Sequence, residues 1–63
     1  MRPLDLAVQF RQEIQQAKSQ GQARWAHKVE GPLDKEFCNE VAKIADCFYY
    51  SSESDPVEFY RKL

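Results

Sequence analysis

The sequence predicts an all-α fold in which a helical hairpin is followed by a short C-terminal helix. Three observations lead to this prediction: apolar residues recur at helical spacing near the N-terminus, they do so again in the middle of the chain, and a helix-start signal precedes the last eight residues. Because the chain has 63 residues, we expect residues 1–63 to form a single small helical domain.

The first predicted helix runs from Pro3 to Gln20. Proline suits the first turn of a helix, where its missing N–H is not needed. Apolar side chains then form one stripe about 100° wide, which one neighbouring element can cover. Its members are Leu6, Ala7, Phe10, Ile14 and Ala17. Leu4 and Val8 fall outside this stripe, and the other faces are rich in glutamine.

The central predicted helix runs from Pro32 to Tyr50 and has a much wider apolar face. At about 100° per residue, apolar side chains fill an arc of about 180°. They are Leu33, Phe37, Cys38, Val41, Ala42, Ile44, Ala45, Phe48 and Tyr49. An arc of this width exceeds what one neighbouring helix covers, so we expect at least two partners for it.

The segment between these helices has two open questions. Gly21 either ends the first helix or lies within a longer one, and a break is favoured because a continued helix would place Lys28 at the centre of the apolar stripe. Residues 22–30 alternate as a strand would, yet one strand has no partner in an otherwise helical chain, so a short helix is favoured. Trp25 either closes the core or anchors an interface, and the core is favoured.

The C-terminal segment carries a strong helix-start signal. Asp55 is placed as the N-cap, Pro56 as the first helical residue and Glu58 as the partner in a capping box. A helix of about two turns is too short to be stable alone. We therefore expect Phe59, Tyr60 and Leu63 to dock on the free part of the central helix.

Composition suggests that the chain needs additional buried area. Only 14 residues are Leu, Ile, Val or Phe, and small domains of this kind often gain buried area by forming a symmetric dimer. We expect a homodimer that acts by binding a regulatory protein. The residues assigned to this assembly are Trp25, Phe37, Val41, Ile44, Phe48 and Tyr49.

Catalysis and metal binding are not indicated. His27 is the only histidine, and a nucleophilic pair would need a serine or cysteine beside it in a cleft. Cys38 and Cys47 would lie on opposite faces of the central helix, about 13 Å apart along its axis, without CxxC spacing. We therefore expect two thiols, no catalytic residue, no metal, no cofactor and no enzymatic activity.

Charge gives limited support to nucleic-acid binding. The net charge is −1, although residues 1–30 carry five basic and three acidic side chains and residues 31–63 carry four and seven. A small helical DNA-binding dimer that uses Arg24 and Lys28 is the alternative function. It is not favoured, because the helix that would enter the groove exposes mainly acidic residues.

The sequence offers no reason to expect a membrane protein. No apolar run is long enough to span a bilayer, and the first residues lack the apolar core of a signal peptide. The expected location is the cytoplasm.

The opening block MRPLDLAVQFRQEIQQAK resembles the start of a small early protein of lambdoid bacteriophages, encoded between the exonuclease and excisionase genes. The chain also resembles that protein in its length of 63 residues and in its order of predicted helices, a Gln-rich helix followed by an acidic, cysteine-bearing one. It implies a non-enzymatic helical protein that acts in the host bacterial cytoplasm and tunes phage development, such as the choice between lysis and lysogeny, or host physiology. It implies no site residues.

Overall fold

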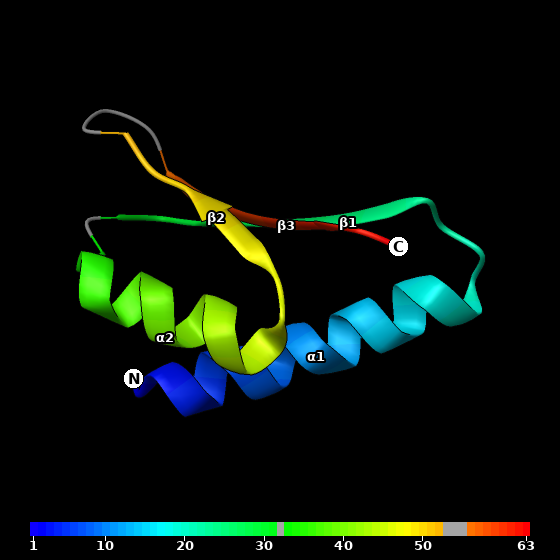
Figure 1. Cartoon of the computed structure of the whole chain (residues 1–63), viewed down its shortest axis with the longest axis horizontal. Helices are drawn as coiled ribbons and strands as arrows, with labels where there is room; N and C mark the ends of the chain where they lie inside the picture. Colours follow the sequence, from blue (N-terminus) through cyan, green and yellow to red (C-terminus); the bar gives the residue numbers. More distant parts are fainter. Residues whose placement is uncertain (32, 53–55) are drawn as a thin grey trace.

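The computed structural model describes residues 1–31, 33–52 and 56–63 and shows two layers, a pair of helices below a sheet (Figure 1). In order, the elements are α1 (Pro3–Ser19), β1 (Arg24–Val29), α2 (Lys35–Ala45), β2 (Phe48–Tyr50) and β3 (Val57–Lys62). The fold is therefore α+β, and the prediction of an all-α helical hairpin with a short C-terminal helix is wrong.

The sheet is antiparallel and has the strand order β1-β3-β2. The central strand, β3, pairs with β1 from Arg24 opposite Lys62 to Val29 opposite Val57. On its other side it pairs with β2 from Phe48 opposite Tyr60 to Tyr50 opposite Glu58. Both helices lie on the same face of this sheet (Figure 1).

The first helix is confirmed, and so is its break at Gly21. All five stripe residues of α1 are buried, and Pro3 lies in the first turn. Gly21 has a φ of 75°, the left-handed conformation that glycine adopts without strain. Its N–H donates to the carbonyl of Lys18, and that of Gln22 donates to the carbonyl of Ala17, each at 3.0 Å. These two bonds form a Schellman motif, which satisfies carbonyls left free at the helix end.

The central helix is shorter than predicted at both ends. It begins at Lys35 and ends at Ala45, and Asp46 then adopts a left-handed conformation with a φ of 58°. Aspartate tolerates this conformation better than most residues, and the three aromatic residues that follow favour a strand. Phe48 and Tyr49 therefore belong to β2 and not to the apolar arc of a helix. Pro32, predicted as the first helical residue, lies outside the described residues.

Two segments predicted as helices are strands, and both predictions are wrong for the same reason. Residues 24–29 form β1, so the prediction of a short helix there is wrong. The C-terminal helix is also wrong, because residues 57–62 form β3, whose inward side chains Val57 and Phe59 are buried. A strand at residues 24–29 was not favoured because it had no partner strand, and β3 is that partner. Asp55, predicted as an N-cap, lies outside the described residues.

The core lies between the two layers and is centred on Phe10. The Phe10 ring centroid lies 5.0 Å from that of Trp25, 5.0 Å from that of His27 and 4.8 Å from that of Phe59. From α2, Cys38, Val41 and Ala45 complete the buried set. The role of Trp25 as a core residue is thus confirmed, with 6% of its surface exposed.

Candidate functional site

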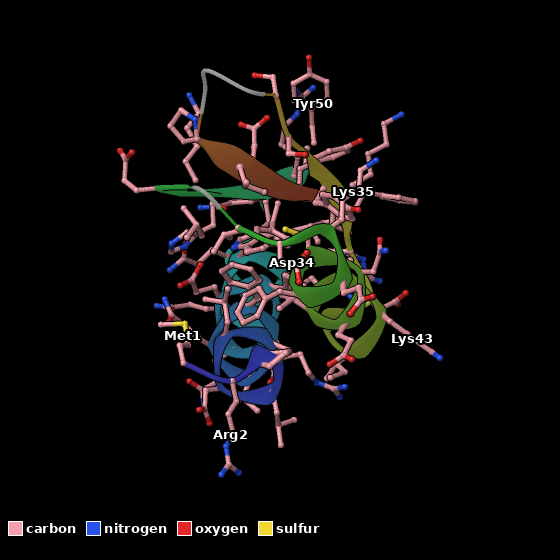
Figure 2. All side chains as sticks on the ribbon, turned by 90° about the vertical axis from the view of Figure 1, so that its left-hand side faces the viewer. Met1, Arg2, Asp34, Lys35, Lys43 and Tyr50 are labelled. Atoms are coloured by element: carbon pink, nitrogen blue, oxygen red, sulfur yellow. The ribbon has the colours of Figure 1, made fainter. Side chains whose placement is uncertain are left out.

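One face of the sheet is not covered by any element among the described residues. Side chains alternate along each strand, so that one set points at the helices and the other points away. We call the second set the open face; it consists of Arg24, Ala26, Lys28, Phe48, Tyr50, Glu58, Tyr60 and Lys62. Figure 2 shows Tyr50 on the side of the sheet remote from the helices.

Three aromatic side chains lie together on the open face. Phe48 and Tyr60 are direct cross-strand partners, and their rings stack with centroids 5.9 Å apart and planes inclined by 28°. Tyr50 is two residues from Phe48 on β2 and therefore shares its face. The exposed fractions are 65% for Phe48, 62% for Tyr50 and 42% for Tyr60. Ring surface that a core would bury is here left to solvent.

Basic side chains lie at both ends of this aromatic group. Arg24 and Lys62 are cross-strand partners at one end, and Lys28 lies on β1 at the other. All three are exposed, and none forms an ion pair with a described residue. Glu58 is the only acidic side chain among the described residues of the open face. The face is thus positively charged, although the whole chain has a net charge of −1.

A shallow depression separates the basic pair from the rings. It has a volume of about 460 Å³, and the open-face residues that line it are Arg24, Ala26, Phe48, Glu58, Tyr60 and Lys62. Ala26 is the partner of Tyr60 on the side away from Phe48, and its small side chain leaves one flank of the Tyr60 ring uncovered. The depression can therefore receive a flat group against this ring.

A second cluster of polar residues lies between the layers, around Glu13 of α1. Its Oε1 accepts a hydrogen bond from Nε1 of Trp25 at 3.1 Å and lies 2.8 Å from Nδ1 of His27. Gln9 donates to its Oε2 at 3.0 Å. Burial raises the pKa of Glu13, but these hydrogen bonds and the charge of His27 lower it more, so that the pKa lies below its ordinary value of 4.5. An ionised carboxylate only accepts, so Nδ1 of His27 carries a proton.

This cluster ties α1 to β1 through the contacts of Glu13 with Gln9, Trp25 and His27, and neither cysteine is among these contacts. Both cysteines are free, with Cys38 buried and Cys47 partly buried. Burial raises the pKa of the Cys38 thiol, with a further contribution from the charge of Asp34. Burial also raises the pKa of the Cys47 thiol to about 11, together with the charge of Asp46 and against that of Arg61. Both thiols are thus protonated, weak nucleophiles at neutral pH.

The described residues contain no cluster of three or more metal-ligating side chains. Metal binding would require several His, Cys, Asp or Glu side chains to converge on one point. The open face offers only Glu58 of these types, so it has no set of ligands for an ion.

The residues predicted for assembly do not lie together on one surface of the structure. Trp25 and Val41 are buried in the chain's own core, while Phe37, Ile44 and Tyr49 pack against that core and are partly buried. Of the predicted set, Phe48 alone is largely exposed. Arg24 and Lys28, predicted as nucleic-acid contacts, are also on the open face, on β1, with β3 between them and Phe48.

Sequence analysis missed Tyr50, Tyr60 and Lys62 as members of this site. They had been placed on helices, where their spacing puts them on different faces. The alternation of Val57, Phe59 and Arg61 with Glu58, Tyr60 and Lys62 was the signal available in the sequence.

No helix in the described part of the chain combines the length and apolar character that a membrane span requires. No protein-family model matches the sequence, and neither a curated protein nor a solved structure is significantly similar to it.

Proposed function

We propose that this chain is a non-enzymatic regulatory protein that acts by binding another macromolecule on the open face. The observation that carries this proposal is the group of three exposed rings, those of Phe48, Tyr50 and Tyr60, on one side of the sheet. Contiguous exposed apolar surface with a polar rim is typical of interaction sites. Aromatic residues are also the side chains most enriched where binding energy is concentrated.

The contacts of the Glu13 carboxylate support binding over catalysis. The Glu13–His27 pair resembles the base of a hydrolytic site, but the carboxylate oxygen that orients His27 also accepts from Trp25, within the contact between layers. The contacts at the Glu13 carboxylate therefore have a structural explanation.

The resemblance of the opening block to early proteins of lambdoid phages supplies the biological setting. In this setting the protein acts inside the infected bacterium and shifts the balance between lysis and lysogeny, or alters host physiology. Its small size fits a protein that acts by binding a partner through one surface.

The test is a phage that encodes the double variant Phe48→Ala plus Tyr60→Ala. We expect its lysogenisation frequency to change to that of a phage lacking the protein, because the rings that bind the partner are removed. The control is Lys35→Ala plus Lys43→Ala, two exposed positions on α2, which should behave as wild type. Wild-type behaviour of the aromatic variant, at normal protein levels, would contradict the proposal.

A second candidate is binding to a protein, in particular a second copy of this chain, through the outer face of α1. Leu4 and Val8 lie one turn apart and are 55% and 43% exposed, and Met1 precedes them with 88% exposed. A chain of 63 residues commonly gains stability by burying such surface in a dimer. Light scattering should then give a mass of about 15 kDa, twice the chain's 7.4 kDa, and Leu4→Ser plus Val8→Ser should return it to one chain.

A further inference from the structure

We propose that the open face binds single-stranded nucleic acid, with bases stacked on its rings and phosphates held by its basic side chains. This inference rests on the proposed function and names its ligand. The partner class is chosen from two properties of the face that occur together, its stacking surface and its charge.

The first property is the arrangement of the rings. A base has two flat apolar faces, and proteins that bind single strands present aromatic rings on which successive bases stack. The rings of Phe48 and Tyr60 already stack on each other on adjacent strands, and Tyr50 lies further along β2 on the same face. Such a group of rings is suited to bases that follow one another along a strand.

The second property is the position of the cations. Arg24 and Lys62 lie beyond one end of the aromatic group, and Lys28 lies at its other end, opposite Glu58. A strand crossing the rings would therefore meet the basic pair at one end and a lysine beside a carboxylate at the other. None of these side chains is neutralised by an ion pair with a described residue. A protein surface that binds mainly by apolar contact has no need of three free cations around it, whereas a phosphate backbone is bound by them.

The depression beside Tyr60 is a candidate binding site for one base of the strand. Ala26 leaves the flank of that ring open, and Arg24 and Lys62 border the same depression. A base inserted there would stack on Tyr60 while its phosphate meets the basic pair.

The shape of the face selects single strands over duplexes. A double helix keeps its bases stacked on each other, and duplex readers commonly insert a helix or a narrow ribbon into a groove. Here both helices lie on the opposite side of the sheet (Figure 1). The exposed residues of α2 include Glu36 and Glu40. A three-stranded sheet that exposes aromatic rings instead needs unstacked bases.

The test measures fluorescence anisotropy of labelled oligothymidine and oligouridine of about 12 nucleotides, with a duplex of equal length for comparison. Full-length protein is titrated up to about 100 μM at about 50 mM salt, since weak non-specific binding reaches this range. We expect both single strands to bind more tightly than the duplex. A difference between the two single strands would tell whether DNA or RNA is the preferred form.

Leucine and tryptophan variants separate stacking from general apolar contact. Phe48→Leu keeps an apolar side chain but removes the ring, and it should weaken single-strand binding about tenfold. Phe48→Trp keeps a stacking surface and should retain the affinity. Because Phe48 is largely exposed, both variants should fold, which circular dichroism would verify. Unchanged binding by Phe48→Leu would overturn the proposal.

The salt dependence tests the cations. Three contacts to a single strand give a slope of about −2 for log K against log salt, which is about a 15-fold loss of affinity between about 50 and 200 mM. Arg24→Ala plus Lys28→Ala should reduce the slope to about −0.7. The charge-matched control, Lys35→Ala plus Lys43→Ala, should leave it unchanged, and an equal effect of both pairs would contradict the assignment to the open face.

Three other outcomes would also overturn this inference. They are an absence of single-strand binding over the whole titration, a preference for duplex, and a dimer that Phe48→Glu converts to one chain, which would show that a second copy covers the face. If the phage phenotype depends on Phe48 and Tyr60 while no oligonucleotide binds, the proposed function stands and this inference falls. If neither is observed, both fall.

Discussion

Nδ1 of His27 lies 2.8 Å from Oε1 of Glu13, and this contact joins the first strand of the sheet to the helix below it. The same oxygen accepts the indole N–H of the buried Trp25. One carboxylate of α1 thus satisfies two donors of β1, and it fixes the position of the strand that carries Arg24 and Lys28.

Replacing Glu13 by alanine should destabilise the fold. The substitution leaves the Trp25 N–H without its acceptor in a largely buried position, and an unsatisfied buried donor costs about 1–3 kcal/mol. Urea unfolding would measure the loss. Glu36→Ala, at an exposed position of α2, is the control and should change the free energy of unfolding by less than about 0.5 kcal/mol.

The contribution of Glu13 should also depend on pH. Since its pKa in the folded protein lies below its ordinary value of 4.5, the stabilisation is fully present above pH 4.5 and is lost as the pH falls through the folded value. The difference in stability between wild type and Glu13→Gln should therefore shrink as the pH falls below 4.5. A difference that grows as the pH falls below 4.5 would show that the carboxylate does not accept these bonds.

Gly21→Ala should destabilise the protein, because a side chain at a φ of 75° is strained even though its Cβ would meet no atom within 4 Å. The left-handed conformation costs about 1–2 kcal/mol, offset in part by the lower entropy of the unfolded chain. Gly31→Ala is the matched control: its Cβ would lie 3.6 Å from the backbone N of Leu33, an ordinary contact. Thermal unfolding of both variants should show a loss for Gly21 alone.

The thiols should react slowly while the protein is folded. With a pKa of about 11, Cys47 is almost entirely protonated at neutral pH, and Cys38 is buried. Alkylation by iodoacetamide, followed by mass spectrometry of peptides, should be far slower in the folded than in the urea-unfolded protein. The rate at Cys47 should rise with pH until about pH 11, and a plateau near neutrality would contradict the assigned pKa.

Val41→Asp should prevent folding. Val41 is fully buried under the sheet, and an unpaired carboxylate there costs more than a small domain can supply. Ile44→Asp is expected to be less severe, because Ile44 is only partly buried at the edge of the core. Lys43→Asp, on the exposed side of α2, is the control, and circular dichroism of the three variants should rank them in this order.

The first helix could be predicted from the sequence because its pattern is local. Leu6, Phe10 and Ile14 repeat at helical spacing within a helix of 17 residues, and any element that covers this stripe buries it. Gly21 likewise acts through its own backbone conformation. Features of this kind depend on neighbours within four or five positions.

The sheet could not be predicted in the same way, because its evidence is divided between distant segments. Arg24 pairs with Lys62, and neither segment is stable as a strand without the other. The Asp-Pro-Val-Glu sequence has the form of a helix start, but cross-strand pairing on both sides of β3 outweighs that local preference.

The residues of the candidate site are likewise divided between segments that are distant in the sequence. Arg24 and Lys28 were identified because charge is visible in sequence, but the neighbours that give them a role come from β2 and β3. Tyr50 and Tyr60 join them only once the register of the sheet is known.

The central position of β3 has a consequence for how the molecule folds. Strands β1 and β2 do not pair with each other, so each stays without hydrogen-bonded neighbours until β3 arrives between them. Pairing of Arg24 with Lys62 closes a loop that contains α2 and β2, and contacts so distant along the chain slow folding. We therefore expect the helices to form early and the three strands to gain protection from hydrogen exchange in a single late step, at which the open face is assembled.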